Sequence, residues 1–156
     1  RLKGLVDDAV SEGATLLAGG DRPAGLNAGH YLAPTVLTDV TETMAVYREE
    51  TFGPIVSIVP FDTKTELLRM ANDCEEGGLT AYIFTRNLAR AEHYAASLRY
   101  GEIQINGVKY DINLPHGGIG QSGIGHDCSA LALHDYLVQK RITRALDTTT
   151  FGGLNP

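Results

Sequence analysis

The stretch IVSIVPFDTKTELLRMANDCEEGGLTAYIFTRNLARAEHYAASLRYGEIQIN, residues 55–106, decides the fold class. It contains three short apolar runs that suit buried strands, at residues 55–61, 79–85 and 102–106. Two segments with apolar residues at helical spacing separate these runs, at residues 63–73 and 87–101. Thr63 or Thr65 could cap the first helix, and Asn87 could cap the second. Strands that alternate with helices predict an α/β fold with a parallel sheet and right-handed crossovers.

The residues before this stretch extend the pattern less regularly. A helix is expected over residues 1–12 and a short strand over residues 14–20. Residues 30–37 are extended, but Pro34 restricts them to a sheet edge or a bend. Residues 39–54 are polar and end in a Gly-Pro turn.

Beyond Asn106 the regular order is lost. About twenty residues rich in Gly form a loop of a length that is usually functional or disordered. Asp127 is expected to cap a short helix that follows it. Residues 138–146 are expected to form a strand with no partner nearby in sequence, and such a strand often pairs with another chain. Residues 147–156 are expected to be a flexible tail.

The composition excludes several classes of protein. The chain has 156 residues, of which 43% are hydrophobic and 21% charged, and this suits one globular domain. A net charge of -6 argues against a nucleic-acid binder and against a polybasic membrane surface. No run approaches the roughly 18 apolar residues of a membrane span.

The N-terminus and the two cysteines bear on location. The first residues lack an apolar signal segment, and two cysteines are too few for a disulfide scaffold, so we expect a cytoplasmic protein. The chain starts at Arg1 without a Met, which leads us to expect a fragment, a processed product or a trimmed version of a longer protein.

The loop LPHGGIGQSGIGHD, residues 114–127, contains G-x-G-x-x-G at Gly118, Gly120 and Gly123. That spacing is a dinucleotide fingerprint only when a strand directly precedes it and an apolar helix follows. Here about eleven residues separate Asn106 from Gly118, and Ile-Gly-His-Asp follows Gly123. We therefore expect the glycines to fold a long loop tightly rather than to cradle a pyrophosphate.

A second motif is REETFGP, residues 48–54, in which two carboxylates precede an aromatic residue and a turn. A carboxylate at a strand entry can accept hydrogen bonds from sugar hydroxyls, and an aromatic ring can pack against a flat heterocycle. A solvated acidic turn before a core strand explains the same residues. Taken alone, the motif favours the solvated turn.

Five stretches taken together resemble the C-terminal third of the aldehyde dehydrogenase superfamily. In chain order they are GHYLAPTVLTDV, EETFGPIVSIVPFDT, ANDCEEGGLTAYIFTRNLARA, GEIQING and HGGIGQSGIG. The resemblance runs from about Leu2 to about Leu146. Several linked motifs in the correct order are far more specific than any one of them.

The resemblance implies an oxidation of an aldehyde to a carboxylate with NAD or NADP. In that family a cysteine attacks the carbonyl, a hydride passes to the nicotinamide, and the thioester is hydrolysed. The family's nucleophilic cysteine, its general-base glutamate and its main dinucleotide-binding strands lie upstream of the region matched here. The resemblance thus implies that residues 1–137 are the C-terminal part of a catalytic domain, and that this chain alone is inactive.

Residue by residue, the resemblance assigns roles to both motifs. Glu50 matches the glutamate that holds the nicotinamide ribose hydroxyls, and Phe52 matches the aromatic residue that flanks the nicotinamide. This match overturns the preference for a solvated turn. The strand at Val138–Leu146 matches the one that joins a neighbouring subunit's sheet, which implies a homodimer or a homotetramer.

The segment from Gly107 to His116 matches the lining of the aldehyde tunnel, and it includes Asp111 and Ile112. His116 departs from the family, because many members have Phe before the Gly-Gly, and it would make the tunnel mouth more polar. Gly120 also departs, since Lys is common there. His116 and Asp111 together hint at a polar or amino-bearing aldehyde. The choice between NAD and NADP is made mainly upstream.

Two other hypotheses remain open. Cys128 lies at the expected helix start beside His126, and both features lower a thiol pKa, so a small cysteine hydrolase is possible chemistry. Cys128 does not match the family nucleophile, however, and Cys74 lies beside two glutamates, so we expect both to be structural. Alternatively, residues 138–146 could make the chain a non-catalytic oligomerisation or regulatory module. We expect no metal site, because the spacing of the candidate ligands fits no common zinc pattern; they are His116, His126, Cys128 and His134.

Overall fold

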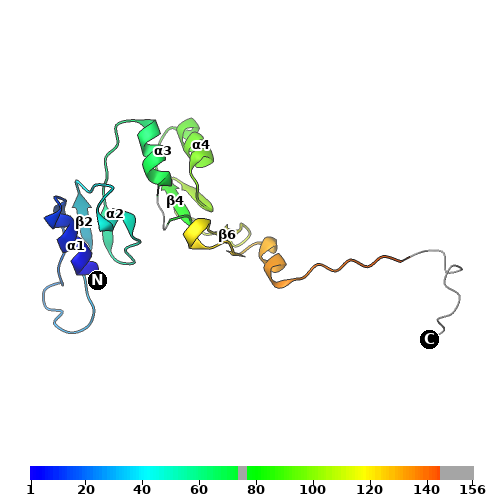
Figure 1. Cartoon of the computed structure of the whole chain (residues 1–156), viewed down its shortest axis with the longest axis horizontal. Coiled ribbons are helices and arrows are strands. Elements are labelled where there is room, and N and C mark those ends of the chain that lie inside the picture. The colour runs from blue at the N-terminus through cyan, green and yellow to red at the C-terminus, as the bar shows by residue number, and fades with distance from the viewer. Residues whose placement is uncertain (74–76, 145–156) are drawn as a thin grey trace, which may run out of the picture.

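The computed structural model describes residues 1–73 and 77–144. Figure 1 shows three groups of elements that follow one another along the chain, and then an extended segment that leads away from them. The three sheets are separate, with strand orders β1-β2-β3, β4-β5 and β6-β7. The chain is therefore an α/β protein with both parallel and antiparallel strand pairs.

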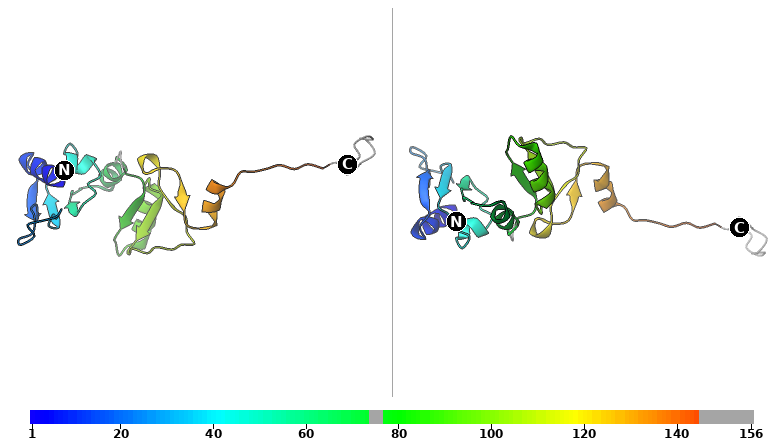
Figure 2. Two further views of the ribbon diagram at one scale, coloured as in Figure 1. Left: turned by 90° about the horizontal axis from the view of Figure 1, so that it is seen from below. Right: turned by 90° about the horizontal axis from the view of Figure 1, so that it is seen from above.

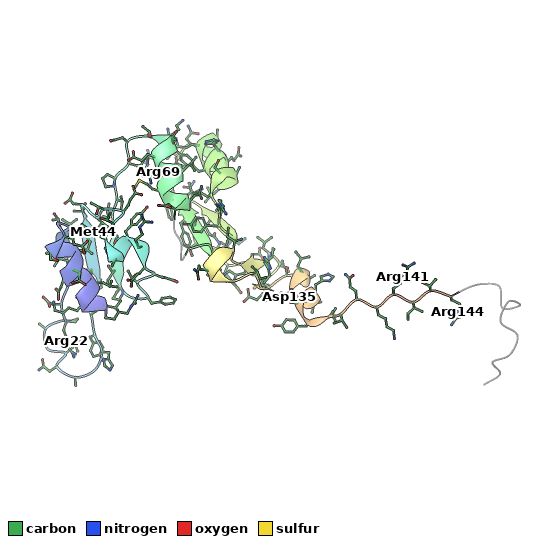
Figure 3. All side chains as sticks on the ribbon, in the orientation of Figure 1. Arg22, Met44, Arg69, Asp135, Arg141 and Arg144 are labelled. Atoms are coloured by element: carbon green, nitrogen blue, oxygen red, sulfur yellow. The ribbon has the colours of Figure 1, made fainter. Side chains whose placement is uncertain are left out.

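The first group packs two helices against a three-stranded sheet. Its elements are α1 (Leu2–Ser11), β1 (Thr15–Ala18), β2 (Thr35–Thr38), α2 (Ala45–Arg48) and β3 (Ile55–Ser57). The helix and strand expected over residues 1–20 are confirmed, since α1 buries Leu5, Val6 and Ala9 on one face. Met44 is also fully buried in this core and lies near α1 and α2 in Figure 3.

One expectation for this group is wrong, and one helix was not expected. Residues 30–37 were expected at an edge or bend, but β2 is the central strand, antiparallel to β1 and parallel to β3. Pro34 is compatible with this position because β2 begins one residue after it, at Thr35. The polar segment 39–54 contains the short helix α2, whose buried residue is Val46.

The second group is a βαβ unit preceded by a helix. Its elements are α3 (Lys64–Asn72), β4 (Thr80–Ile83), α4 (Leu88–Ser97) and β5 (Glu102–Ile105). Thr63, not Thr65, caps α3 by accepting from the Glu66 amide at 3.1 Å, and Asn87 caps α4 by accepting from the Arg90 amide at 2.9 Å. The parallel pairing of β4 with β5 is confirmed.

The expected single sheet through residues 55–106 is only partly correct. The strand at 55–61 was expected beside the other two, but β3 pairs with β2, with Thr35 opposite Ile55. The strands of the second group, β4 and β5, form a sheet of their own. Each sheet also has its own core cluster, one around Leu37 and one around Ala91.

The third group is a small hairpin with two 3-10 helices. Its elements are β6 (His116–Gly117), η1 (Gly120–Ser122), β7 (His126–Asp127) and η2 (Ala130–Tyr136). The expected cap at Asp127 is wrong, because Asp127 belongs to β7, and Ser129 caps η2 by accepting from the Leu131 amide at 3.2 Å.

The predicted C-terminal strand is not found in the described part of the chain. Residues 138–144 are extended without a strand partner, and Val138 is 95% exposed. Figure 2 shows this segment running clear of the three groups in both views, and Figure 3 shows Arg141 and Arg144 along it. Residues 145–146 of the predicted strand, and the predicted tail at 147–156, lie outside the described residues.

Among residues 1–73 and 77–144, none of the helices has the length and apolar character needed to span a bilayer.

Candidate functional site

Glu50 lies in the connection between α2 and β3 and faces the second group of elements. It lines a cleft of about 190 Å³ whose walls include Leu79, Tyr100 and Ser122. These residues come from three different parts of the chain. The cleft therefore forms only when the Glu50 connection, the start of β4 and the glycine loop are brought together.

The Glu50 connection is held by the first residues of the chain. The Arg1 guanidinium donates to the Glu50 carbonyl at 2.9 Å and to the Thr51 carbonyl at 3.0 Å. Leu2 packs so closely on Gly53 that a Cβ at this glycine would overlap the leucine side chain. Sequence reasoning missed Arg1, because nothing in its local pattern distinguishes it from a solvated residue at a helix start.

Phe52 is placed differently from Glu50. Its backbone has φ of 45°, in the left-handed region that bulky residues rarely adopt, and 80% of the residue is exposed. It is not among the residues that line the Glu50 cleft. Glu50 and Phe52 are therefore close in the sequence, but the structure does not place them in one cleft.

The glycine loop docks on the start of β4 through its backbone. The Gly78 carbonyl accepts from the amides of Gly101 and Ile119, at 2.9 and 3.1 Å. Gly101 allows this approach, since a Cβ there would collide with the Gly117 carbonyl. The docking carries Ser122 into the wall of the Glu50 cleft. Sequence reasoning did not single out Ser122, although it lies inside the glycine motif.

The loop does not have the structure of a dinucleotide fingerprint. The strand before Gly118 has only two residues, and η1 begins two residues after it. A fingerprint loop opens an α-helix whose N-terminus faces the pyrophosphate, whereas this loop leads through a 3-10 turn to β7. The loop therefore lacks the strand–loop–helix geometry of that fingerprint.

His116 is held between two carboxylates. Its Nδ1 lies 2.9 Å from Asp127 Oδ1, and its Nε2 lies 3.8 Å from Glu102 Oε2. His116 and Asp127 are directly opposite each other in the β6–β7 ladder, so the strand register sets this pair. The Tyr110 ring meets the imidazole edge-on, with centroids 5.9 Å apart. The imidazole is thus fixed in orientation, and only about a third of its side chain is exposed.

The partner carboxylate Glu102 is itself fixed. Thr80 donates its hydroxyl to Glu102 Oε2 at 3.3 Å, and Gln104 donates to Glu102 Oε1. Gln104 also bonds the Lys109 backbone through both atoms of its amide, at 2.8 and 3.2 Å. This chain of hydrogen bonds ties the loop after β5 to the strand.

Asp111 and His116 line one cleft of about 380 Å³, which also includes Tyr110 and Glu102. Hydrogen bonds from the Asn113 backbone and side chain to Asp111 lower the pKa of its carboxyl group below the usual value. Ile112 is not among the cleft residues, and 68% of it is exposed. Of the three predicted tunnel residues, the structure therefore brings two together.

The surroundings of Cys128 differ from those that the cysteine-hydrolase hypothesis assumed. Its sulfur shares a hydrogen bond of 2.6 Å with the Tyr110 hydroxyl. This hydrogen bond is the main cause, and desolvation the second, that raises the pKa of Tyr110 to about 12. The short helix expected after Asp127 begins only at Ala130, as the 3-10 helix η2 capped by Ser129, so Cys128 is not in its first turn. The helix-start argument for a cysteine hydrolase is therefore wrong, while Cys74 lies outside the described residues.

The clefts on the two sides of the glycine loop adjoin each other. A third cleft is lined by His116, Asp127 and His126, and it shares Leu79 and Ser122 with the Glu50 cleft. Glu50 and His116 therefore line two separate clefts that have Leu79 and Ser122 in common. Over the described ranges, 1–73 and 77–144, no three His, Cys, Asp or Glu side chains are grouped to hold a metal ion.

Comparison with known proteins identifies the family of the chain. The family model described as "Aldehyde dehydrogenase family" matches residues 1–142. The peroxisomal aminoaldehyde dehydrogenase 1 of Pisum sativum is 38% identical over 152 residues, which cover 97% of this chain and 30% of that protein. The chloroplastic betaine aldehyde dehydrogenase of Atriplex hortensis is 35% identical over 149 residues, which cover 95% and 30%. The chain thus spans about a third of the length of these curated relatives.

Solved structures give the same result. Betaine aldehyde dehydrogenase from Staphylococcus aureus in complex with NAD+ superposes with a TM-score of 0.84 at 35% identity, covering 97% of this chain and 31% of that one. An NADP-dependent enzyme from E. coli superposes with a TM-score of 0.78 at 34% identity, covering 86% and 28%. The family model, the relatives and the solved structures agree along nearly the whole of residues 1–144, and the chain belongs to the aldehyde dehydrogenase family.

Proposed function

We propose that this chain is the C-terminal part of an NAD- or NADP-dependent aldehyde dehydrogenase. The observation that carries the proposal is the pair of adjoining clefts, one lined by Glu50 and the other by His116, with Leu79 and Ser122 in both. A hydride transfer needs cofactor and aldehyde in contact. A cofactor-binding residue and a substrate-binding residue in clefts that share two wall residues are consistent with that need.

Each predicted residue has a role in this proposal. Glu50 accepts hydrogen bonds from the two hydroxyls of the nicotinamide ribose, for which an exposed carboxylate in a cleft is suited. Phe52 flanks the nicotinamide, and its large exposed fraction leaves the ring available for that contact. Asp111, Ile112 and His116 line the path of the aldehyde. The nicotinamide, when bound, accepts the hydride.

The remaining chemical groups are proposed to lie outside this chain. The nucleophilic cysteine and the general-base glutamate are assigned to the rest of the protein, because neither cysteine here matches the family nucleophile. The chain alone is therefore inactive. Dehydrogenase turnover by the purified 156-residue chain carrying Cys74→Ser and Cys128→Ser would contradict this assignment.

The central test uses the whole enzyme that contains this chain. Aldehyde-dependent reduction of NAD and NADP is followed by absorbance in the wild type, in Glu50→Gln and in Glu92→Gln, an exposed glutamate on α4. Glu50→Gln is expected to raise KM for the dinucleotide about tenfold, because a charge-assisted hydrogen bond is lost, while Glu92→Gln behaves as wild type. Absence of any aldehyde-dependent reduction in the wild type would contradict the proposed function.

Residues Val138–Leu146 are proposed to pair with a second copy of the chain in a homodimer or homotetramer. Support comes from the extended, unpaired backbone of residues 138–144 and from the exposure of Val138 and Ile142. Ile142→Asp should lower the mass measured by light scattering, whereas Gln139→Asp, on the opposite face of an extended segment, should leave it unchanged. A wild-type monomer would remove this part of the proposal.

A cytoplasmic location is proposed from the sequence alone. Relatives named above are described as peroxisomal and chloroplastic, so location varies among similar proteins. Microscopy of the tagged whole protein tests it, and a signal confined to an organelle would contradict it.

A further inference from the structure

We infer that Arg1 is a positioning residue, which fixes the backbone of Glu50 and Thr51 so that the Glu50 carboxylate faces the dinucleotide ribose. The inference rests on the proposed function, since it concerns how the cofactor-binding glutamate is oriented. Arg1 itself is not placed in contact with the cofactor.

The contacts of Arg1 span three consecutive residues. Its Nη1 donates to the Thr51 carbonyl at 3.0 Å, and its Nη2 donates to the Glu50 carbonyl at 2.9 Å. Nη2 also lies 3.4 Å from Glu49 Oε2. One planar group thus fixes two successive peptide units, the one that follows Glu50 and the next.

These two peptide units lie where regular structure gives no support. Helix α2 ends at Arg48 and β3 begins at Ile55, so residues 49–54 belong to neither. The next residue, Phe52, adopts the left-handed region, which costs a bulky side chain free energy. A segment of this kind keeps one conformation only if its surroundings hold it there, and the Arg1 guanidinium supplies two of the hydrogen bonds that do so.

The backbone of Arg1 is itself held in place. Arg1 directly precedes α1, and its carbonyl accepts from the Leu5 amide at 3.1 Å, which ties it to the helix. Leu2 closes on Gly53 at the other end of the same connection. The start of α1 therefore lies against residues 49–53, and the Arg1 backbone from which the guanidinium extends is part of the helix start.

The chemistry of arginine suits this task better than that of lysine. A guanidinium presents donors in a fixed fork and can bond two carbonyls at once, whereas an ammonium is a point charge on a flexible stem. If the fork is lost, the Glu50 connection must be ordered when the dinucleotide binds, and this ordering weakens binding. Binding of the aldehyde is not weakened in this way, because the aldehyde site lies beyond Leu79 and Ser122 and does not include the Glu50 connection.

The test uses the whole enzyme with Arg1→Met, Arg1→Lys and Arg22→Met. Arg22 is the matched control, because its guanidinium also donates to a backbone carbonyl, that of Leu26 at 3.0 Å, in the loop where Figure 3 labels it. Arg1→Met is expected to raise KM for the dinucleotide about threefold to tenfold, with KM for the aldehyde unchanged. Arg1→Lys should give a smaller rise, and Arg22→Met none.

A double-mutant cycle with Glu50→Gln separates positioning from independent binding. Because Arg1 acts through Glu50, Arg1→Met should raise KM for the dinucleotide much less in the Glu50→Gln enzyme than in the wild type. If KM for the dinucleotide in the double variant rises by the product of the two single-variant increases, the inference is overturned. So does a rise in both KM values that follows a lower melting temperature, since that pattern marks a merely structural role.

The outcomes also separate this inference from the proposed function. If Glu50→Gln raises KM for the dinucleotide and Arg1→Met does not, the proposed function stands and the inference fails. If the wild-type enzyme reduces neither NAD nor NADP in the presence of aldehydes, the proposed function fails, and the inference fails with it.

Discussion

Arg69 on α3 and Glu42 before α2 form a bidentate ion pair, in which the guanidinium donates to both carboxylate oxygens at 2.6 and 2.7 Å. Arg48 reinforces it by donating to the Glu42 carbonyl and by pairing with Asp73 at 3.3 Å. These contacts join the first group of elements to the second, and Figure 3 shows Arg69 between the two groups. Residues of both groups also line the Glu50 cleft.

The first prediction concerns the pH dependence of this ion pair. Hydrogen bonding to Arg69 lowers the pKa of Glu42 below its ordinary value of 4.5. A carboxyl group with a lowered folded-state pKa contributes stability above its unfolded value, and the contribution is lost as pH falls through the folded value. Arg69→Met should therefore lower the melting temperature at pH 7, and the difference from wild type should shrink below pH 4.5. An equal difference at both pH values would contradict the assignment.

The second prediction concerns the core under the first sheet. Leu37 is completely buried on β2, while Leu17 on β1 is mostly exposed. Leu37→Ala removes buried methyl groups and leaves a cavity, so it should lower the free energy of unfolding by about 2–5 kcal/mol. Leu17→Ala should change it by less than about 0.5 kcal/mol. Urea denaturation of the two variants measures both values, and similar losses would show that the core is wrongly placed.

The third prediction concerns substrate preference. His116 is oriented by Asp127 and lines a cleft with Asp111, so the site is polar where many family members have Phe. His116→Phe in the whole enzyme should shift the ratio of kcat/KM values toward apolar aldehydes by about tenfold, the amount that a buried apolar contact commonly contributes. His30→Phe, in the exposed loop before β2, is the control. An unchanged ratio would exclude His116 as a determinant of preference.

The fourth prediction concerns Tyr110, whose pKa is raised to about 12 chiefly by its hydrogen bond to Cys128. The neutral phenol is favoured, so Tyr110 should ionise about two pH units later than an ordinary tyrosine with a pKa of about 10. Comparing ultraviolet titrations of wild type and Tyr110→Phe isolates its ionisation, and the same comparison in a Cys128→Ala background should give a lower pKa. Ionisation of Tyr110 at the ordinary pH would contradict the Cys128 contact.

The sequence predicted most of the local structure because local signals set it. Thr63 and Asn87 mark helix starts through capping, which depends only on residues three positions ahead. Which strands pair in one sheet, by contrast, depends on residues that are far apart in the sequence. The pairing of β3 with β2 depends on residues about twenty positions apart, and the pattern in 55–61 suited either neighbour.

The candidate site shows the same division. Glu50 and His116 were found by family resemblance, whereas Arg1 and Asp127 were not selected, because their roles depend on contacts with distant residues. Arg1 and Glu50 are 49 positions apart in the sequence, and Asp127 and His116 are eleven positions apart, on the two strands of a hairpin. A pattern in one sequence contains no record of such contacts. The residue-level roles of Glu50, Phe52, Asp111, Ile112 and His116 stay predictions until the variants are measured.

The β6–β7 ladder has a consequence for anyone who would transplant this site. His116 is oriented from the opposite strand, and the loop between the two strands also supplies Ser122 to the neighbouring cleft. Moving His116 by itself into a related enzyme would leave its imidazole without the Asp127 carboxylate. The transferable unit is the whole hairpin from Leu114 to Asp127, together with Gly101, whose lack of a side chain makes room for it.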